Sequence, residues 1–162
     1  MARLSCPQQP GVPLHLVLRG EPVEPAATLA RLEAAAQCPV HAYALMGTHA
    51  HLLLTPLVPA GAMPLIEALG AREFDASPVY ARRYVLACMR YIELNPVRAG
   101  LARHPAHYRW TSYRANALGE ADPRVTAHPL YCALGRTAEE RRAAYRRSFR
   151  GAATSLARRP AC

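Results

Sequence analysis

The sequence contains no lysine, and all 20 of its basic residues are arginine. Its five cysteines are scattered along the chain and none stands in a Cys-x-x-Cys pair, so the pattern predicts neither a zinc knuckle nor a disulfide framework. No apolar run approaches the length of a membrane span, and the first residues lack the apolar core of a signal peptide. We therefore expect a cytoplasmic protein with reduced cysteines and no membrane partner.

The basic residues are concentrated in the second half of the chain. Residues 1–81 contain four arginines and six acidic residues, for a net charge of −2, whereas residues 82–162 contain 16 arginines and five acidic residues, for a net charge of +11. Such asymmetry is typical of a surface that binds a polyanion, and the guanidinium group suits phosphate because it forms paired hydrogen bonds. A solvated arginine-rich surface explains the charge equally well.

Apolar periodicity and turn residues predict an α+β fold. Strands are expected at 13–19, 40–46, 49–55 and 73–79, and helices at 25–36, 62–69, 80–94 and from Thr137 onward. Pro96 is expected to end the third helix, and Thr137 with Glu140 fits a capping box. The order predicts a ferredoxin-like (RRM-like) antiparallel sheet with helices on one face, plus a basic C-terminal helical extension. We expect residues 1–119 to form the core domain and 120–162 the extension.

Two histidines stand two residues apart on the third predicted strand. Side chains at i and i+2 of a strand point to the same face, so His49 and His51 project together while Leu52 and Leu54 face the core. Two neutral imidazoles on one face form half of a metal site. Such a pair is about as often incidental, so the spacing alone leaves both readings open.

Tyr91 and Asn95 lie four residues apart near the end of the best predicted helix, and are therefore neighbours on one helical face. A tyrosine can act as a covalent nucleophile, and an asparagine carbonyl is a hard oxygen ligand for a divalent ion. The alternative is structural, with Tyr91 packed in the core and Asn95 capping the helix before Pro96.

Three ordered motifs carry a resemblance to a known family. They are His-Ala-Tyr-Ala-Leu-Met-Gly-Thr-His-Ala-His-Leu-Leu-Leu at 41–54, Arg-Tyr-Ile-Glu-Leu-Asn-Pro-Val-Arg-Ala-Gly-Leu at 90–101 and Tyr-Arg-Trp-Thr-Ser-Tyr-Arg-Ala at 108–115. In this order they resemble the REP-associated tyrosine transposases, relatives of the single-tyrosine insertion-sequence transposases. The resemblance runs from about residue 11 to about residue 149.

The resemblance implies a ferredoxin-like, RRM-like domain over residues 1–119 that cuts and rejoins single-stranded DNA at hairpin-bearing repeats. It implies that His49 and His51 hold Mg²⁺ or Mn²⁺, with Asn95 as the third ligand. It also implies that Tyr91 attacks a backbone phosphorus to form a 5′-phosphotyrosine. Relatives often assemble as two subunits, so a homodimer is a further expectation.

The segment 108–114 mixes cations, hydroxyls and aromatic rings. Arg109 and Arg114 are candidate phosphate contacts, and Trp110 and Tyr113 are candidate rings for stacking a base. Alternatively, the two rings anchor this segment onto the core, which we favour slightly for Trp110. The other candidate phosphate contacts are Arg90, Arg98 and Arg103.

Two segments, between residues 20 and 41 and between 69 and 74, are shorter than the family pattern, and Glu73 and Asp75 stand where the family is basic. The chain is therefore interpreted as a trimmed active enzyme, a DNA-binding remnant or a decaying element copy.

An unrelated metal hydrolase is disfavoured because no carboxylate-rich cluster accompanies the histidine pair, and Glu93 points away from Tyr91. The remaining histidines are assigned no ligand role, namely His15, His41, His104, His107 and His128.

Overall fold

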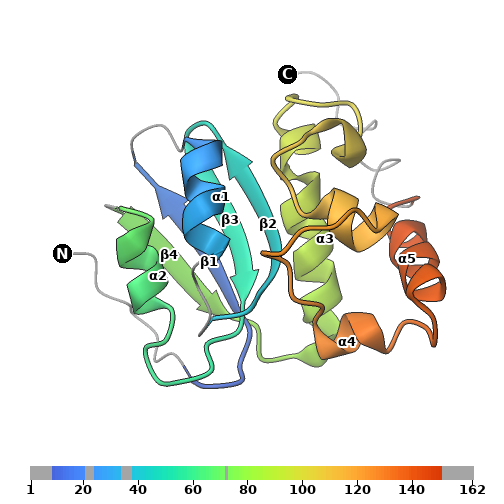
Figure 1. Ribbon diagram of the computed structural model, residues 1–162, viewed down its shortest axis with the longest axis horizontal. Coiled ribbons are helices and arrows are strands. Elements are labelled where there is room, and N and C mark those ends of the chain that lie inside the picture. The colour runs from blue at the N-terminus through green and yellow to red at the C-terminus, as the bar shows by residue number, and fades with distance from the viewer. Residues whose placement is uncertain (1–8, 21–23, 34–37, 72, 151–162) are drawn as a thin grey trace, which may run out of the picture.

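The computed structural model describes residues 9–20, 24–33, 38–71 and 73–150. Four antiparallel strands form one sheet in the order β2-β3-β1-β4 (Figure 1). The strands are β1 (Leu14–Arg19), β2 (Val40–Met46), β3 (His49–Leu54) and β4 (Glu73–Pro78). Gly47 and Thr48 form the predicted turn between β2 and β3. This order and pairing confirm the predicted α+β, ferredoxin-like class.

One face of the sheet, which we call the closed face, is covered by α1 (Pro25–Glu33) and α2 (Met63–Ala68) (Figure 1). Alternation along β1 directs Leu14, Leu16 and Leu18 to this face, where all three are buried. The helices contribute apolar residues to the same cluster. These two helices lie on one face as predicted, although residues 34–36 of the predicted first helix lie outside the described residues.

The opposite face, the half-open face, carries α3 (Arg82–Arg98), which packs mainly on β2. Ala42 and Ala44 of β2 are buried beneath Met89 and Ile92 of α3, and such small residues let the helix approach the sheet closely. The expectation of helices on one face therefore does not extend to α3, because this helix has an apolar stripe of its own to bury.

Helix α3 continues through Pro96 to Arg98, so the prediction that Pro96 ends the helix was wrong. A proline in the last turn removes one backbone hydrogen bond, and Pro96 itself is buried. Packing of this turn offsets that loss. The extra turn matters because it brings Asn95 and Arg98 onto the helix that carries Tyr91.

Beyond α3, the chain folds back onto the side of this helix that faces away from the sheet (Figure 1). Its elements are two short helices, η1 (Pro105–His107) and η2 (Arg114–Leu118), followed by α4 (Pro129–Cys132) and α5 (Ala138–Arg147). Tyr131, Tyr145 and Phe149 share one buried cluster with Ile92 of α3. The cluster joins the C-terminal elements to the core.

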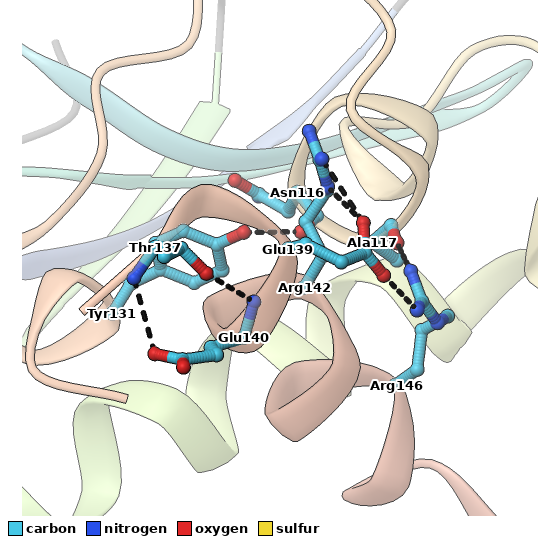
Figure 2. Close-up of polar contacts among 8 residues, drawn as sticks. All are labelled: Asn116, Ala117, Tyr131, Thr137, Glu139, Glu140, Arg142 and Arg146. Carbon is cyan, nitrogen blue, oxygen red and sulfur yellow. Dashed lines mark hydrogen bonds and ion pairs between the residues drawn. The ribbon is translucent and has the colours of Figure 1, made fainter. Parts of the chain in front are cut away.

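Polar contacts fix these C-terminal elements to each other (Figure 2). The predicted capping box is present, because the Thr137 hydroxyl accepts from the Glu140 amide and the Glu140 carboxylate accepts from the Thr137 amide. Tyr131 donates to the Asn116 carbonyl over 2.5 Å, and Arg146 donates to the Ala117 carbonyl over 2.6 Å. Helices α4 and α5 are thereby tied to η2.

The thiols carry no disulfide among the described residues. Cys38 is buried, Cys88 is partly buried and Cys132 is exposed, all three as free thiols. Cys6 and Cys162 lie outside the described residues. Within the part of the chain that the structure describes, no helix is both long enough and apolar enough to cross a membrane.

Candidate active site

The histidine pair lies where strand alternation predicts. His49 and His51 point to the half-open face from β3, and their ring centroids are 5.0 Å apart. Their neighbours Leu52 and Leu54 are buried on the closed face. In the pairing with β1, His51 lies opposite Val17 and His49 opposite Arg19. The predicted shared face of the two imidazoles is therefore observed.

Helix α3 brings Tyr91 over this pair. The centroid of the Tyr91 ring lies 6.0 Å from that of His51, with the two rings nearly perpendicular. The guanidinium carbon of Arg98 lies 4.7 Å from the centre of the Tyr91 ring, and Tyr91 is 41% exposed. Because the ring is open to solvent, the alternative in which Tyr91 packs in the core is wrong.

Asn95 lies one helical turn beyond Tyr91. Its side-chain nitrogen donates to the Tyr91 backbone carbonyl over 3.0 Å. That bond uses the amide N–H and leaves the lone pairs of the side-chain oxygen for a further partner. Within the described ranges, no three His, Cys, Asp or Glu side chains converge to hold a metal ion. A metal on this face would therefore use the two imidazoles together with a neutral oxygen.

His15 of β1 also belongs to this site, although the sequence around it shows no spacing typical of metal ligands. Its Nε2 lies 3.1 Å from Nδ1 of His51, and the two rings stack with centroids 5.4 Å apart. The Tyr91 ring stands edge-on at 5.9 Å from the His15 ring. Strand alternation was the one available signal: Leu14 and Leu16 face the core, so His15 between them faces the other side of the sheet. The histidines that it meets there depend on the pairing of β1 with β3.

Burial and neighbouring charge favour the neutral form of all three imidazoles. The pKa of His51 falls to about 4, mainly because burial penalises its charged form and secondly because of His15, His49 and Arg19. Burial also lowers the pKa of His15, and burial with the nearby Arg19 lowers that of His49. At neutral pH the unprotonated nitrogens can bind a metal ion, which fits the donor set expected for a divalent ion.

The acidic residues that depart from the family pattern lie on this face too. Glu73 and Asp75 are exposed on β4, and Asp75 forms an ion pair with Arg19 of β1. Arg19 is thus held beside His49 by a carboxylate. A phosphate approaching the histidines would meet a cation that is already paired, and this pairing weakens the attraction of the β1–β4 edge for a polyanion.

Tyr113 was wrongly predicted to stack a base. Its side chain is 3% exposed and lies between His104 and Phe149 in the buried cluster. Trp110 packs partly against the closed-face core, which is the anchoring role favoured above. The Arg109 guanidinium carbon lies 4.2 Å from the centre of the Trp110 ring. The segment 108–114 is therefore chiefly an anchor.

The remaining predicted phosphate contacts differ in how far they are engaged within the protein. Arg114 forms an ion pair with Glu120 at 2.7 Å, and Arg90 donates to the Ser148 carbonyl over 2.9 Å. Arg103 is exposed, and among the described contacts it forms no such pairing. Arg98 is the predicted cation that the structure brings to Tyr91.

Two further expectations concern side chains outside the site. His41 has the structural role expected of it, because its ring contacts the Thr126 carbonyl at 2.7 Å and the Thr55 hydroxyl at 2.8 Å. Glu93 points away from Tyr91, as predicted, and is fully buried. Its carboxylate accepts hydrogen bonds from the three side chains of Ser112, Asn116 and Tyr145.

Comparison with known proteins gives one match in structure. No protein-family model matches the sequence, and no curated protein matches it. The fold is similar to a solved structure of a REP-associated tyrosine transposase bound to a REP hairpin, with a TM-score of 0.58 and 10% sequence identity. The match covers 79% of this chain and 93% of the other. At this identity the similarity establishes the fold.

Proposed function

We propose that this chain is a metal-dependent enzyme that nicks and rejoins single-stranded DNA at hairpin-bearing repeats, with Tyr91 as the nucleophile. The observation that carries the proposal is the solvent-open Tyr91 ring, 6.0 Å from the ring of His51 on the half-open face. The structural neighbour supports it, because that transposase is bound to a REP hairpin. The +11 net charge of residues 82–162 suits a polyanionic substrate.

In the proposed reaction, the Tyr91 oxygen attacks a backbone phosphorus and loses its proton. The bond from phosphorus to the 3′ oxygen breaks, and that oxygen leaves with the bonding electrons and takes up a proton. A 5′-phosphotyrosine and a free 3′-hydroxyl result, and attack by a 3′-hydroxyl on the phosphotyrosine rejoins a strand without ATP. Arg98, beside the Tyr91 ring, supplies positive charge to the phosphate.

His49, His51 and the Asn95 side-chain oxygen are the proposed metal-holding groups. A divalent ion such as Mg²⁺ or Mn²⁺, when bound there, polarises the scissile phosphate and stabilises the charge that develops on it. We assign His15 as the acceptor of the 3.1 Å hydrogen bond from Nδ1–H of His51. This tautomer leaves Nε2 of His51 unprotonated for the metal, so His15 is a positioning residue.

A second candidate function is a DNA-binding protein that does not cut. It is favoured by the +11 net charge of residues 82–162, and by the lack of a third His, Cys, Asp or Glu ligand among the described residues. This candidate predicts salt-sensitive DNA binding that is unaffected when Tyr91 is replaced by Phe. A homodimer is a separate proposal, tested by light scattering of the purified chain.

The two functions are separated by a denaturing-gel assay. The protein is incubated with Mn²⁺ and hairpin-bearing single-stranded DNA labelled at either end, alongside Tyr91→Phe, His49→Ala and the control Tyr80→Phe. Tyr80 is an exposed tyrosine outside the site. We expect a protein-linked labelled band from the unmodified chain and from the control, and no such band from the two site variants. A mobility shift without any linked band in all four proteins would instead establish the DNA-binding function.

Metal binding is measured separately from catalysis. Mn²⁺ titration followed by electron paramagnetic resonance is expected to show one bound ion that is lost in His49→Ala. For His15→Phe we expect affinity to fall by about 10- to 100-fold, the usual cost of removing the partner of a ligating histidine. Unchanged Mn²⁺ affinity in His15→Phe would refute the positioning role of His15.

A further inference from the structure

A second exposed tyrosine lies on α3 on the same side as Tyr91. Tyr84 precedes Tyr91 by seven residues, and Arg98 follows it by seven, so the three side chains lie in one row along the helix. At a rise of about 1.5 Å per residue, Tyr84 and Tyr91 are roughly 10 Å apart along the axis. Tyr84 is 54% exposed, more than Tyr91 itself. The core packing of α3 does not account for this ring.

Each ring in the row is paired with an arginine. The guanidinium carbon of Arg83 lies 4.8 Å from the centre of the Tyr84 ring, and Arg83 also donates to the Tyr84 hydroxyl over 3.2 Å. Arg98 stands at 4.7 Å from the Tyr91 ring in the same kind of contact. A guanidinium covers one side of a ring and keeps free N–H groups for phosphate, while the other side of the ring can accept a base.

The charge of α3 indicates which partner this row fits. The helix contains four arginines, and its only carboxylate, Glu93, is buried on the side away from the row. An exposed helix surface that carries cations and aromatic rings but no acid is complementary to a polyanion that has flat apolar faces. Single-stranded nucleic acid has both properties, since its phosphates are charged and its bases are unstacked.

We propose that Tyr84 is a stacking site for a base of single-stranded DNA, a few nucleotides from the phosphate that Tyr91 attacks. The inference rests on the proposed function, because it takes the DNA strand to lie along α3. A gap of roughly 10 Å corresponds to about three nucleotides at ~3.4 Å per phosphate, and fewer in an extended strand. Arg83 holds the ring in place and contacts the adjoining phosphate.

The test is an equilibrium binding measurement on the full chain with a fluorescein-labelled, hairpin-bearing single-stranded oligonucleotide. Tyr84→Ala is expected to weaken binding by about 5- to 100-fold, the usual effect of losing one stacked base, whereas Tyr84→Phe keeps the ring and restores the affinity. Leu118→Ala, which removes an exposed apolar side chain outside α3, is the matched control and is expected to bind like the unmodified chain.

A second oligonucleotide series, with one base at a time replaced by an abasic site, identifies the stacked base. At one position, removal of the base should weaken binding by the unmodified chain but have no further effect on binding by Tyr84→Ala.

Equal affinity of Tyr84→Ala and the unmodified chain would overturn the inference and leave the Tyr91 adduct assay unaffected. A change in molar mass of Tyr84→Ala by light scattering, without change in DNA affinity, would assign the row to a protein interface and also overturn it. Absence of DNA binding by the unmodified chain would remove both the inference and the proposed function.

Discussion

The two faces of the sheet differ in chemistry although the same strands build both. On the closed face, β1 and β3 supply leucines that are buried beneath α1 and α2. On the half-open face the intervening residues of those strands include His15, Arg19, His49 and His51. In β1, for example, the even-numbered residues stabilise the fold by packing into the core, whereas the odd-numbered residues include polar, titratable groups. The buried core on the closed face therefore does not require the polar residues of the site on the other face.

The largest effect expected from this comparison is a difference in stability between adjacent residues. Leu16 is fully buried on the closed face, whereas Val17, its neighbour in β1, is partly exposed on the half-open face. We expect Leu16→Ala to lower the free energy of unfolding by about 2–5 kcal/mol because it leaves a cavity. Val17→Ala should cost less than about 1 kcal/mol. Chemical denaturation of both variants measures this, and equal losses would contradict the division between the faces.

A second effect concerns the carboxyl group of Glu93, which is buried between α3 and the C-terminal elements. Burial raises the pKa of Glu93 from its ordinary 4.5 to about 7, despite hydrogen bonds from Ser112, Asn116 and Tyr145 that lower it. The folded protein thus keeps this proton while the unfolded chain releases it, so the contribution of Glu93 to stability falls as pH rises from about 4.5 to about 7. The total change is on the order of 3 kcal/mol.

Glu93→Gln isolates this contribution, because an amide does not titrate and can still bond to the same three partners. The histidines with lowered pKa values contribute an opposite slope, which is common to both proteins and cancels in the difference. We expect the stability of the unmodified chain relative to Glu93→Gln to decrease from pH 4.5 to pH 7 in denaturation curves. A difference that is constant with pH would show that Glu93 titrates normally.

The smallest effect should come from the exposed ion pair on the half-open face. Asp75→Asn removes the partner of Arg19, and an exposed pair of this kind contributes about 1 kcal/mol or less to stability. It also releases a cation beside His49 and removes a negative charge, so DNA affinity should rise several-fold at low salt. Fluorescence anisotropy at two salt concentrations measures this rise. Unchanged or weaker binding would mean that the DNA does not approach the β1–β4 edge.

Much of the candidate site follows from local patterns in the sequence. Alternation in β3 predicted that His49 and His51 share a face, and helical spacing predicted that Tyr91 and Asn95 are neighbours. The position of His15 in the site depends on the pairing of β1 with β3, which brings together residues 36 positions apart in the chain. Spacing within a motif carries no information about such a contact.

The errors have physical causes of the same kind. Tyr113 resembles a stacking residue by its aromatic and basic neighbours, but tertiary packing against Phe149 buries it. Pro96 is a helix breaker in isolation, yet burial of the last turn of α3 keeps that turn helical. In both cases the decisive energy comes from contacts with elements distant in sequence, which a single sequence does not specify.

The most direct test of the account is to identify the residue that becomes linked to DNA. The protein is incubated with Mn²⁺ and hairpin-bearing single-stranded DNA, the nucleic acid is digested, and peptides are mapped by mass spectrometry. We predict one modified peptide with a nucleotide joined through a 5′-phosphate to Tyr91. Attachment to another residue, or full recovery of the unmodified Tyr91 peptide under conditions where the DNA is bound, would contradict the assignment of Tyr91 as the nucleophile.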